Sequence, residues 1–233
     1  MRLIVHIMLI ISSFSLIIGQ DQTYNQLDKN QKKTGLWIGY HEKTNNKRYM
    51  GEFQDGQPKG VFNYYAIEGH LSAKVNFMND SLSSTEMYFD NGNVMAKGKF
   101  INQMKQGKWF TYTRDGNLLN IFNFDRGAMH GKQYLYYPLN PETQQVKLME
   151  EYNCKNGLKN GVWKQYFKLG TVKSEGFYKM GKKEGIFTYY FLDGSIDSKG
   201  LFKNNLLKSS KCPKCHILVT RFVSNFSTFI KGS

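Results

Sequence analysis

The chain has 233 residues, of which 40% are hydrophobic and 15% are aromatic, and its formal net charge is +14. This apolar content is enough for a stable core and too low for a bundle of membrane helices. The basic residues are spread along the sequence without a recognition helix or single-strand-binding motif, so we expect a basic surface with no nucleic-acid partner.

Residues 1–19 have the pattern of a secretory signal peptide, because Arg2 precedes a largely apolar run at residues 3–18. This run is shorter than the roughly 20 residues that span a bilayer. We predict cleavage after Gly19, with an uncleaved anchor as the alternative. Residues 20–34 are polar and are expected to form a loose leader. The predicted location is therefore outside the cell or in the periplasm or cell envelope.

Residues 35–207 repeat at intervals of 23 to 25 residues, apart from one interval of 30 that contains a predicted loop insertion at residues 138–143. Each of the seven units opens on a small anchor residue and carries a tyrosine five positions later. The anchors are Gly35, Gly60, Ser83, Gly107, Gly131, Gly161 and Gly185, and the tyrosines are Tyr40, Tyr65, Tyr88, Tyr112, Tyr136, Tyr166 and Tyr190.

A second aromatic column follows the tyrosines, with a turn signal such as Asp115-Gly116 or Asp193-Gly194 between the two columns. Such pairs favour two-residue hairpin loops in which both residues have positive φ. A further turn, for example Asn156-Gly157, leads to the next unit. The second column consists of Phe53, Phe77, Phe100, Phe124, Tyr152, Tyr178 and Phe202.

These patterns predict an all-β fold, an elongated single-layer array of about seven stacked β-hairpins. Stacking would place the tyrosine and phenylalanine columns in a shared core, so we expect the rings of Tyr112 and Tyr136 to be in contact. The third unit departs from the pattern at Ser83 and Thr85, and the fifth departs at Gln133. We expect a local irregularity at the third unit.

The motif G-x-W-x-x-Y-x-x-x-G at residues 161–170, followed by an aromatic residue and a second glycine, resembles MORN repeats. It is most similar to the variant form that is common in bacterial secreted proteins. The resemblance covers residues 35–207 and implies a scaffold, in some cases associated with phospholipid or membranes. Many bacterial variants carry an antitoxin label. The resemblance implies no catalytic residues.

Choline- and glucan-binding repeats also combine aromatic residues with glycine hairpins, and their aromatic cages hold a cationic or sugar ligand. Those repeats are shorter and contain adjacent Trp-Tyr pairs. This chain instead has single tryptophans at Trp37, Trp109 and Trp163, with a period near 24. Binding of a cell-wall ligand in an aromatic cage is therefore the less favoured alternative.

Residues 208–233 form a basic tail whose apolar residues follow a helical spacing. We expect a short cap, helical in this reading, that packs on the last hairpin. A membrane-surface helix, a strand-like cap and a disordered end are the alternatives. The apolar positions are Val219, Phe222, Val223, Phe226, Phe229 and Ile230.

Cys212, Cys215 and His216 match the C-x-x-C-H pattern of haem attachment. We expect no haem, because the residues after His216 include no Met or His, and no zinc, because a fourth ligand is missing. In an oxidising compartment a disulfide between Cys212 and Cys215 is favoured, with Cys154 left free. Two free thiols are the alternative, and no cofactor is expected.

The sequence contains no recognisable catalytic motif, since His41, His70 and His130 each stand alone near a predicted turn. We therefore expect a non-enzymatic repeat scaffold, secreted or periplasmic, that binds a protein partner of unknown identity. The alternatives are a peripheral binder of anionic membrane lipids and an antitoxin-like partner of a toxin.

Overall fold

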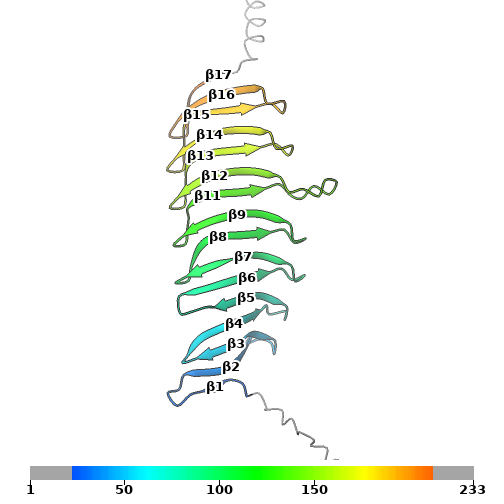
Figure 1. Ribbon diagram of the computed structural model, residues 1–233, viewed down its shortest axis with the longest axis vertical. Helices are drawn as coiled ribbons and strands as arrows, with labels where there is room; N and C mark the ends of the chain where they lie inside the picture. Colours follow the sequence, from blue (N-terminus) through cyan, green and yellow to red (C-terminus); the bar gives the residue numbers. More distant parts are fainter. Residues whose placement is uncertain (1–22, 212–233) are drawn as a thin grey trace, which may run out of the picture.

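The computed structural model describes residues 23–211, which form one open antiparallel sheet of 17 strands without a helix. Strands that follow one another in the sequence are neighbours in space, so the hairpins stack like the rungs of a ladder (Figure 1). The predicted all-β single-layer array is confirmed. The predicted signal peptide at residues 1–19 and the part of the predicted tail after Lys211 lie outside the described residues.

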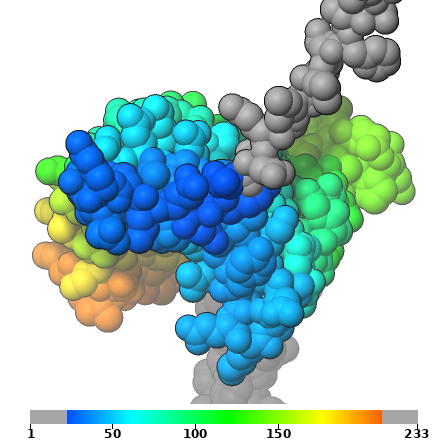
Figure 2. Space-filling view, turned by 90° about the horizontal axis from the view of Figure 1, so that it is seen from below, coloured from blue at the N-terminus to red at the C-terminus, as the bar shows by residue number. Residues whose placement is uncertain are grey.

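The strands are β1 (Gln26–Leu27), β2 (Lys33–Tyr40), β3 (Lys47–Gln54), β4 (Gln57–Tyr65), β5 (Leu71–Phe77), β6 (Leu82–Tyr88), β7 (Val94–Ile101), β8 (Met104–Tyr112), β9 (Leu118–Asp125), β10 (Ala128–Met129), β11 (Gly131–Tyr136), β12 (Leu148–Lys155), β13 (Leu158–Tyr166), β14 (Val172–Lys179), β15 (Lys182–Tyr190), β16 (Ile196–Lys203) and β17 (Leu206–Lys211). Seen from one end, successive units are rotated and fan out behind the first (Figure 2). This rotation is the normal twist of a β-sheet.

Both ends of the array extend further than the repeat pattern predicts. Residues expected in the loose leader form β1, which pairs with β2, and Gln26 accepts a hydrogen bond of 3.1 Å from the indole of Trp37. At the other end β17 pairs with β16 and continues to Lys211. The leader is therefore partly ordered, and the array continues into the first residues of the predicted tail.

The two-residue turns do not lie at the position predicted for them. Gly116 has the expected positive φ of 86°, but its loop runs from Thr113 to Asn117, which are joined by a hydrogen bond of 2.8 Å. The two-residue turns instead lead to the next unit, as at Asn156-Gly157 with φ of 49° and 81°. An Asp-Gly or Asn-Gly pair suits both geometries, because a type I turn followed by one left-handed residue also closes a hairpin.

Met180 occupies the first position of one such two-residue turn, with φ of 49°. A left-handed backbone costs an ordinary side chain about 1 kcal/mol, and asparagine tolerates it better. We therefore expect Met180→Asn to raise the melting temperature. Met95→Asn, at a half-exposed methionine within β7, is the control and should lower it or leave it unchanged. A lower melting temperature for Met180→Asn would contradict this account.

The glycine anchors produce β-bulges, and the third unit lacks one. At Gly60, with φ of 67°, the ladder slips, since Glu52 pairs with Lys59 whereas Met50 pairs with Asn63. At Ser83 the pairing of β5 with β6 proceeds without a shift. Serine does not share the freedom of glycine to take positive φ. The strand ladder is therefore more regular at the third unit than at Gly60, and the expected irregularity appears instead at Thr85, whose Oγ1 is buried without a hydrogen-bond partner among the described residues.

The core lies at the third position of each unit, two residues after the anchor. Phe62, Trp109 and Phe187 have exposed fractions of 1%, 1% and 0%. Each ring lies between two rings of the second aromatic column, as Phe62 does, with centroids 5.2 Å from Phe53 and 5.3 Å from Phe77. We call this side of the sheet the ring face. The second aromatic column is therefore a core element.

The tyrosine column lies on the opposite side of the sheet, which we call the tyrosine face. Side chains alternate along a strand, so positions two and five after the anchor point in opposite directions. Tyr40 is 51% exposed, and within residues 23–211 no ring contact joins two tyrosines of the column. The expected contact between Tyr112 and Tyr136 is therefore wrong.

The strand that precedes each large core ring often carries a glycine directly against it. A Cβ atom added at Gly51, Gly98 or Gly176 would lie closer than 3.0 Å to the ring of Phe62, Trp109 or Phe187. At the third unit Val75 replaces the glycine, and Thr85, which pairs with it, replaces the ring. The small residue at Thr85 is thus accompanied by a larger neighbour in the preceding strand.

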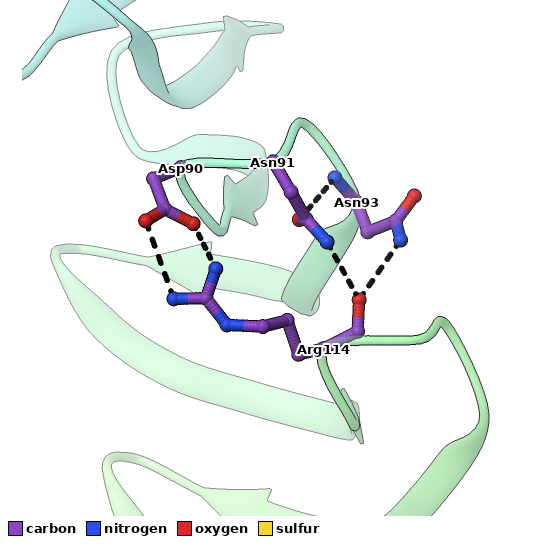
Figure 3. A network of polar contacts seen from close by, with 4 residues as sticks. All are labelled: Asp90, Asn91, Asn93 and Arg114. Atoms are coloured by element: carbon purple, nitrogen blue, oxygen red, sulfur yellow. Dashed lines mark hydrogen bonds and ion pairs between the residues drawn. The ribbon is translucent and has the colours of Figure 1, made fainter.

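Turns of successive units also hold one another through polar contacts. Arg114, in the turn between β8 and β9, forms a double ion pair with Asp90 in the turn of the preceding unit (Figure 3). Its carbonyl oxygen accepts hydrogen bonds of 3.0 Å from Asn91 and 2.8 Å from Asn93. The hydrogen bond from Arg114 lowers the pKa of Asp90 below its usual value.

Candidate functional site

On the ring face, lysines of the chain itself cover the core rings. Lys33, Lys105, Lys159 and Lys183 each stand two residues before an anchor. The ammonium of Lys33 lies 4.5 Å from the ring centroid of Trp37, and that of Lys105 lies 4.5 Å from Trp109. These are cation–π distances. The place that an aromatic cage would offer to a cationic ligand is therefore occupied in these units.

On the tyrosine face, the C-terminal half carries a row of phenol–carboxylate pairs. The hydroxyl of Tyr166 donates to Glu151, and that of Tyr190 donates to Glu175, both at 2.7 Å. Glu175 also lies 3.2 Å from the ammonium of Lys164. Because each pair joins two adjacent strands, the row fixes the side chains of this face in position.

The same contacts shift the pKa values of these groups. Burial, followed by the hydrogen bond to Glu151, raises the pKa of Tyr166 to about 12. The hydrogen bond from Tyr190 is the main cause that lowers the pKa of Glu175, and Lys164 acts in the same direction. At neutral pH the tyrosines are therefore protonated donors and the carboxylates are charged acceptors.

We predict that stability falls at alkaline pH. Burial is the main cause that raises the pKa of Tyr88, Tyr152 and Tyr166 to about 12. A raised pKa stabilises the folded state below the ordinary tyrosine value of 10, and the benefit disappears as the pH rises through 12. The denaturant midpoint should decrease as the pH rises from 10 to 12, and the absorbance at 295 nm should show that these tyrosines ionise at a higher pH than free tyrosine. A midpoint independent of pH across this range would contradict the prediction.

An exposed apolar patch occupies the tyrosine face of the last two units. Val162 pairs with Phe177, and Ile186 pairs with Leu201 on the next hairpin. Their exposed fractions are 51%, 45%, 60% and 44%. We call these four residues the apolar patch. Neighbouring apolar side chains at this exposure are typical of interaction surfaces.

At the positions that correspond to the apolar patch, the first two units have one apolar residue opposite a polar one, Leu36 with Glu52 and Val61 with Asn76, and the third to fifth units have only polar or charged residues. Ser84 pairs with Lys99, Lys108 pairs with Asn123, and Lys132 pairs with Asn153. Packing within the array does not require apolar residues there. The apolar patch is therefore a local feature. In the sequence it could have been recognised in β13 to β16, where apolar residues occur on both faces of the strands and not on the ring face alone.

A hollow of about 530 Å³ lies on the tyrosine face over β5 to β8. Lysines surround it, and the acidic residue in its lining, Glu86, accepts a hydrogen bond of 2.7 Å from Tyr88. We call this region the basic hollow, and it offers a concentrated positive charge to an anionic group. Its lysines are Lys74, Lys97, Lys99 and Lys108.

The loop insertion projects beyond the row of hairpin turns between β11 and β12 (Figure 1). A second hollow of about 580 Å³ lies between the insertion and the turn at Lys168 and Leu169. The hydroxyl of Tyr137 donates a 2.7 Å hydrogen bond to the carbonyl oxygen of Tyr166, which ties the start of the insertion to the next unit. The predicted insertion is thus an ordered feature of the surface.

Cys154 is a buried free thiol, and burial raises its pKa. Cys212 and Cys215, the candidate disulfide, lie outside the described residues. The Nε2 atom of His41 lies 3.0 Å from the carbonyl oxygen of Tyr65, at the corresponding turn of the next unit. Across residues 23–211, no cluster of three or more metal-ligating side chains occurs, and no helix has the length and apolar character of a membrane span.

The comparisons with known proteins agree with the repeat structure. Residues 159–180 and 183–204 match the family described as MORN repeat variant, so the resemblance is confirmed for two consecutive repeats. MORN repeats are generally associated with protein or membrane-lipid binding. No curated protein matches the chain. The two matched repeats are the units that carry the apolar patch.

Three solved structures show low similarity. A TarM mutant from S. aureus, in complex with fondaparinux, alpha-GlcNAc-glycerol and UDP, is 14% identical, with a TM-score of 0.31 over 43% of this chain and 19% of that one. A second TarM structure is 14% identical, with a TM-score of 0.27 over 63% and 20%. A Bacteroides fragilis protein of unknown function is 6% identical, with a TM-score of 0.14 over 81% and 99%. The chain therefore spans about a fifth of the TarM chains it matches.

Proposed function

We propose that this protein is a secreted or periplasmic, non-enzymatic scaffold whose tyrosine face binds an acidic protein partner. The observation that carries the proposal is the apolar patch of Val162, Phe177, Ile186 and Leu201, which the array does not need for its own packing. A few apolar side chains at the centre of an interface commonly supply most of its binding energy.

Rigidity and charge support the same proposal. Cross-strand contacts such as Tyr190 with Glu175 hold the tyrosine face in one arrangement, so binding costs little side-chain ordering. The basic hollow lies on the same face and would attract an acidic partner before the apolar patch makes contact. A toxin held by an antitoxin-like array would be one partner of this kind.

The test compares two double variants of the immobilised full-length protein. Phe177→Asp with Ile186→Asp places charges in the apolar patch, whereas Leu158→Asp with Met180→Asp places them at two exposed apolar residues near turns. We expect the wild type and the second variant to retain the same envelope or secreted proteins, and the patch variant to lose them. Equal retention by all three would contradict the proposal.

The basic hollow favours anionic membrane lipid as a second candidate ligand, because its lysines gather on one face. Lys97→Glu with Lys99→Glu should abolish sedimentation with anionic vesicles, whereas Lys203→Glu with Lys208→Glu should have little effect. Binding should also weaken as salt increases. Sedimentation that is absent from the wild type, or equal for both variants, would exclude the hollow as a lipid site.

A further inference from the structure

The apolar patch lies in the units that are nearest to the C-terminal end of the chain. Its four residues belong to β13, β14, β15 and β16, the last four strands before β17. In the third to fifth units the corresponding positions are polar or charged, and in the first two units only one residue of each pair is apolar. Paired apolar residues are therefore confined to the hairpins next to residues 212–233, which continue the chain beyond the array.

The chain leaves the array on the tyrosine face, beside the apolar patch. Leu201 of the patch pairs with Ser209 in β17. Lys211, the last described residue, pairs with Lys199. Paired side chains lie on the same side of a sheet, and every second residue of a strand shares one face. Lys211 therefore lies on the tyrosine face, two positions along β17 from the direct neighbour of Leu201.

The distances allow the residues that follow Lys211 to reach the whole patch. Neighbouring strands are about 4.8 Å apart, so the patch is roughly 14 Å wide and its far strand, β13, lies roughly 19 Å from β17. Residues 212–218 can span about 23 Å when they are extended. A helix at residues 219–230, as predicted from the sequence, is about 18 Å long. The segment therefore has the length to start beside β17 and cross all four strands of the patch.

The sequence of this segment provides an apolar side that matches the patch in chemistry. Its apolar residues fall on one side of the predicted helix, and Ser224 and Thr228 fall on the opposite side. Packing of two apolar surfaces against each other removes both from water, which is favourable. The apolar residues of the segment are Val219, Phe222, Val223, Phe226, Phe229 and Ile230.

The chain's own segment fits the patch better than a second copy of the protein does. A segment joined by a short linker has an effective concentration on the order of millimolar, above that of a separate molecule in dilute solution. A contact between two copies would bring together two molecules that each have a formal net charge of +14, and such charge opposes self-association. A cover within the chain also explains why the apolar pairs occur only in the units that the segment can reach.

We propose that residues 219–230 lie across the apolar patch, with Phe222 and Phe226 against its side chains. The segment then covers the tyrosine face of the last two units and leaves the open edge of β17 uncovered. It competes with the partner for the same side chains, so release of the segment exposes the binding surface. This competition rests on the proposed function, whereas the contact within the chain does not.

The test records the methyl NMR signals of the full-length protein at low and high protein concentration. Phe222→Asp with Phe226→Asp should release the segment and remove two aromatic rings from the patch. The methyl signals of Ile186 and Val162 should therefore shift, because the ring currents that act on them are lost. Val61 is the internal control, since it follows the anchor of the second unit as Ile186 follows that of the seventh, and both are exposed. Unchanged Val61 signals also show that the array of the variant is folded.

Ser224→Asp with Thr228→Asp is the matched control variant, because it adds the same charges on the opposite side of the segment. It should leave the Ile186 signals at their wild-type positions. Equal shifts in the two variants, or no shift in either, would overturn the proposal. A wild-type Ile186 signal that changes with protein concentration would assign the contact to a second copy and would also overturn it. No partner is present in this measurement, so its failure is distinct from failure of the tyrosine face to bind a protein.

Discussion

Replacing Trp109 by alanine is expected to lower the free energy of unfolding by about 3–5 kcal/mol, as truncation of a buried aromatic residue does. Trp109 is 1% exposed and lies between Phe100 and Phe124, and its indole donates a 3.1 Å hydrogen bond to the carbonyl oxygen of Lys99. Lys105 covers the ring at 4.5 Å. One substitution therefore removes contacts that join three successive strands.

Tyr112→Ala is the matched control, because Tyr112 belongs to the same strand but lies on the tyrosine face and is half-buried. Its loss should cost roughly 1 kcal/mol or less, as for a surface substitution. Urea unfolding followed by far-UV circular dichroism would compare the two. An equal cost for both variants would show that the core is shared between the two faces of the sheet.

Stability in a stacked array depends on contacts between neighbouring units. Loss of the ring at Trp109 should therefore weaken β7 to β9 first and separate the array into two parts that unfold independently. Hydrogen exchange should report this as faster exchange in β7 to β9 than in β13 to β16. Uniformly faster exchange along the chain would indicate that the whole array unfolds as one unit.

The repeat and its period could be predicted from the sequence because anchor glycines and aromatic columns recur at a nearly fixed spacing. The core face could not be assigned from recurrence alone. The tyrosine column, to which Tyr112 belongs, recurs as strictly as any position of the repeat. Tyr112 nevertheless lies on the half-exposed face, because it is three positions beyond Trp109. Period-two alternation, applied to each strand, would have separated the two columns.

The candidate sites were less predictable for a different reason. The basic hollow and the apolar patch depend on which residues face each other across strands, as Val162 faces Phe177. This register changes at the bulges beside the glycine anchors, and a one-residue slip moves side chains to the other face. The order of the strands could be predicted from the sequence. The cross-strand partners could be assigned only once the positions of the bulges were known.

The last prediction concerns the combined volume of a core ring and of the residue that faces it in the preceding strand. A Cβ atom at Gly98 would lie closer than 3.0 Å to the ring of Trp109, so Gly98→Val should destabilise the protein by about 3 kcal/mol. Trp109→Thr should also be destabilising, because it leaves a cavity. The double variant recreates the pair that the protein itself uses at Val75 and Thr85.

We therefore expect Gly98→Val with Trp109→Thr to be more stable than the sum of the two single changes, with a coupling energy of about 2 kcal/mol. Gly98→Val with Phe187→Thr is the control, because Phe187 contacts Gly176 and lies four hairpins away. That pair should be additive to within about 0.5 kcal/mol. If the first pair is equally additive, the valine at position 75 does not explain the threonine at position 85.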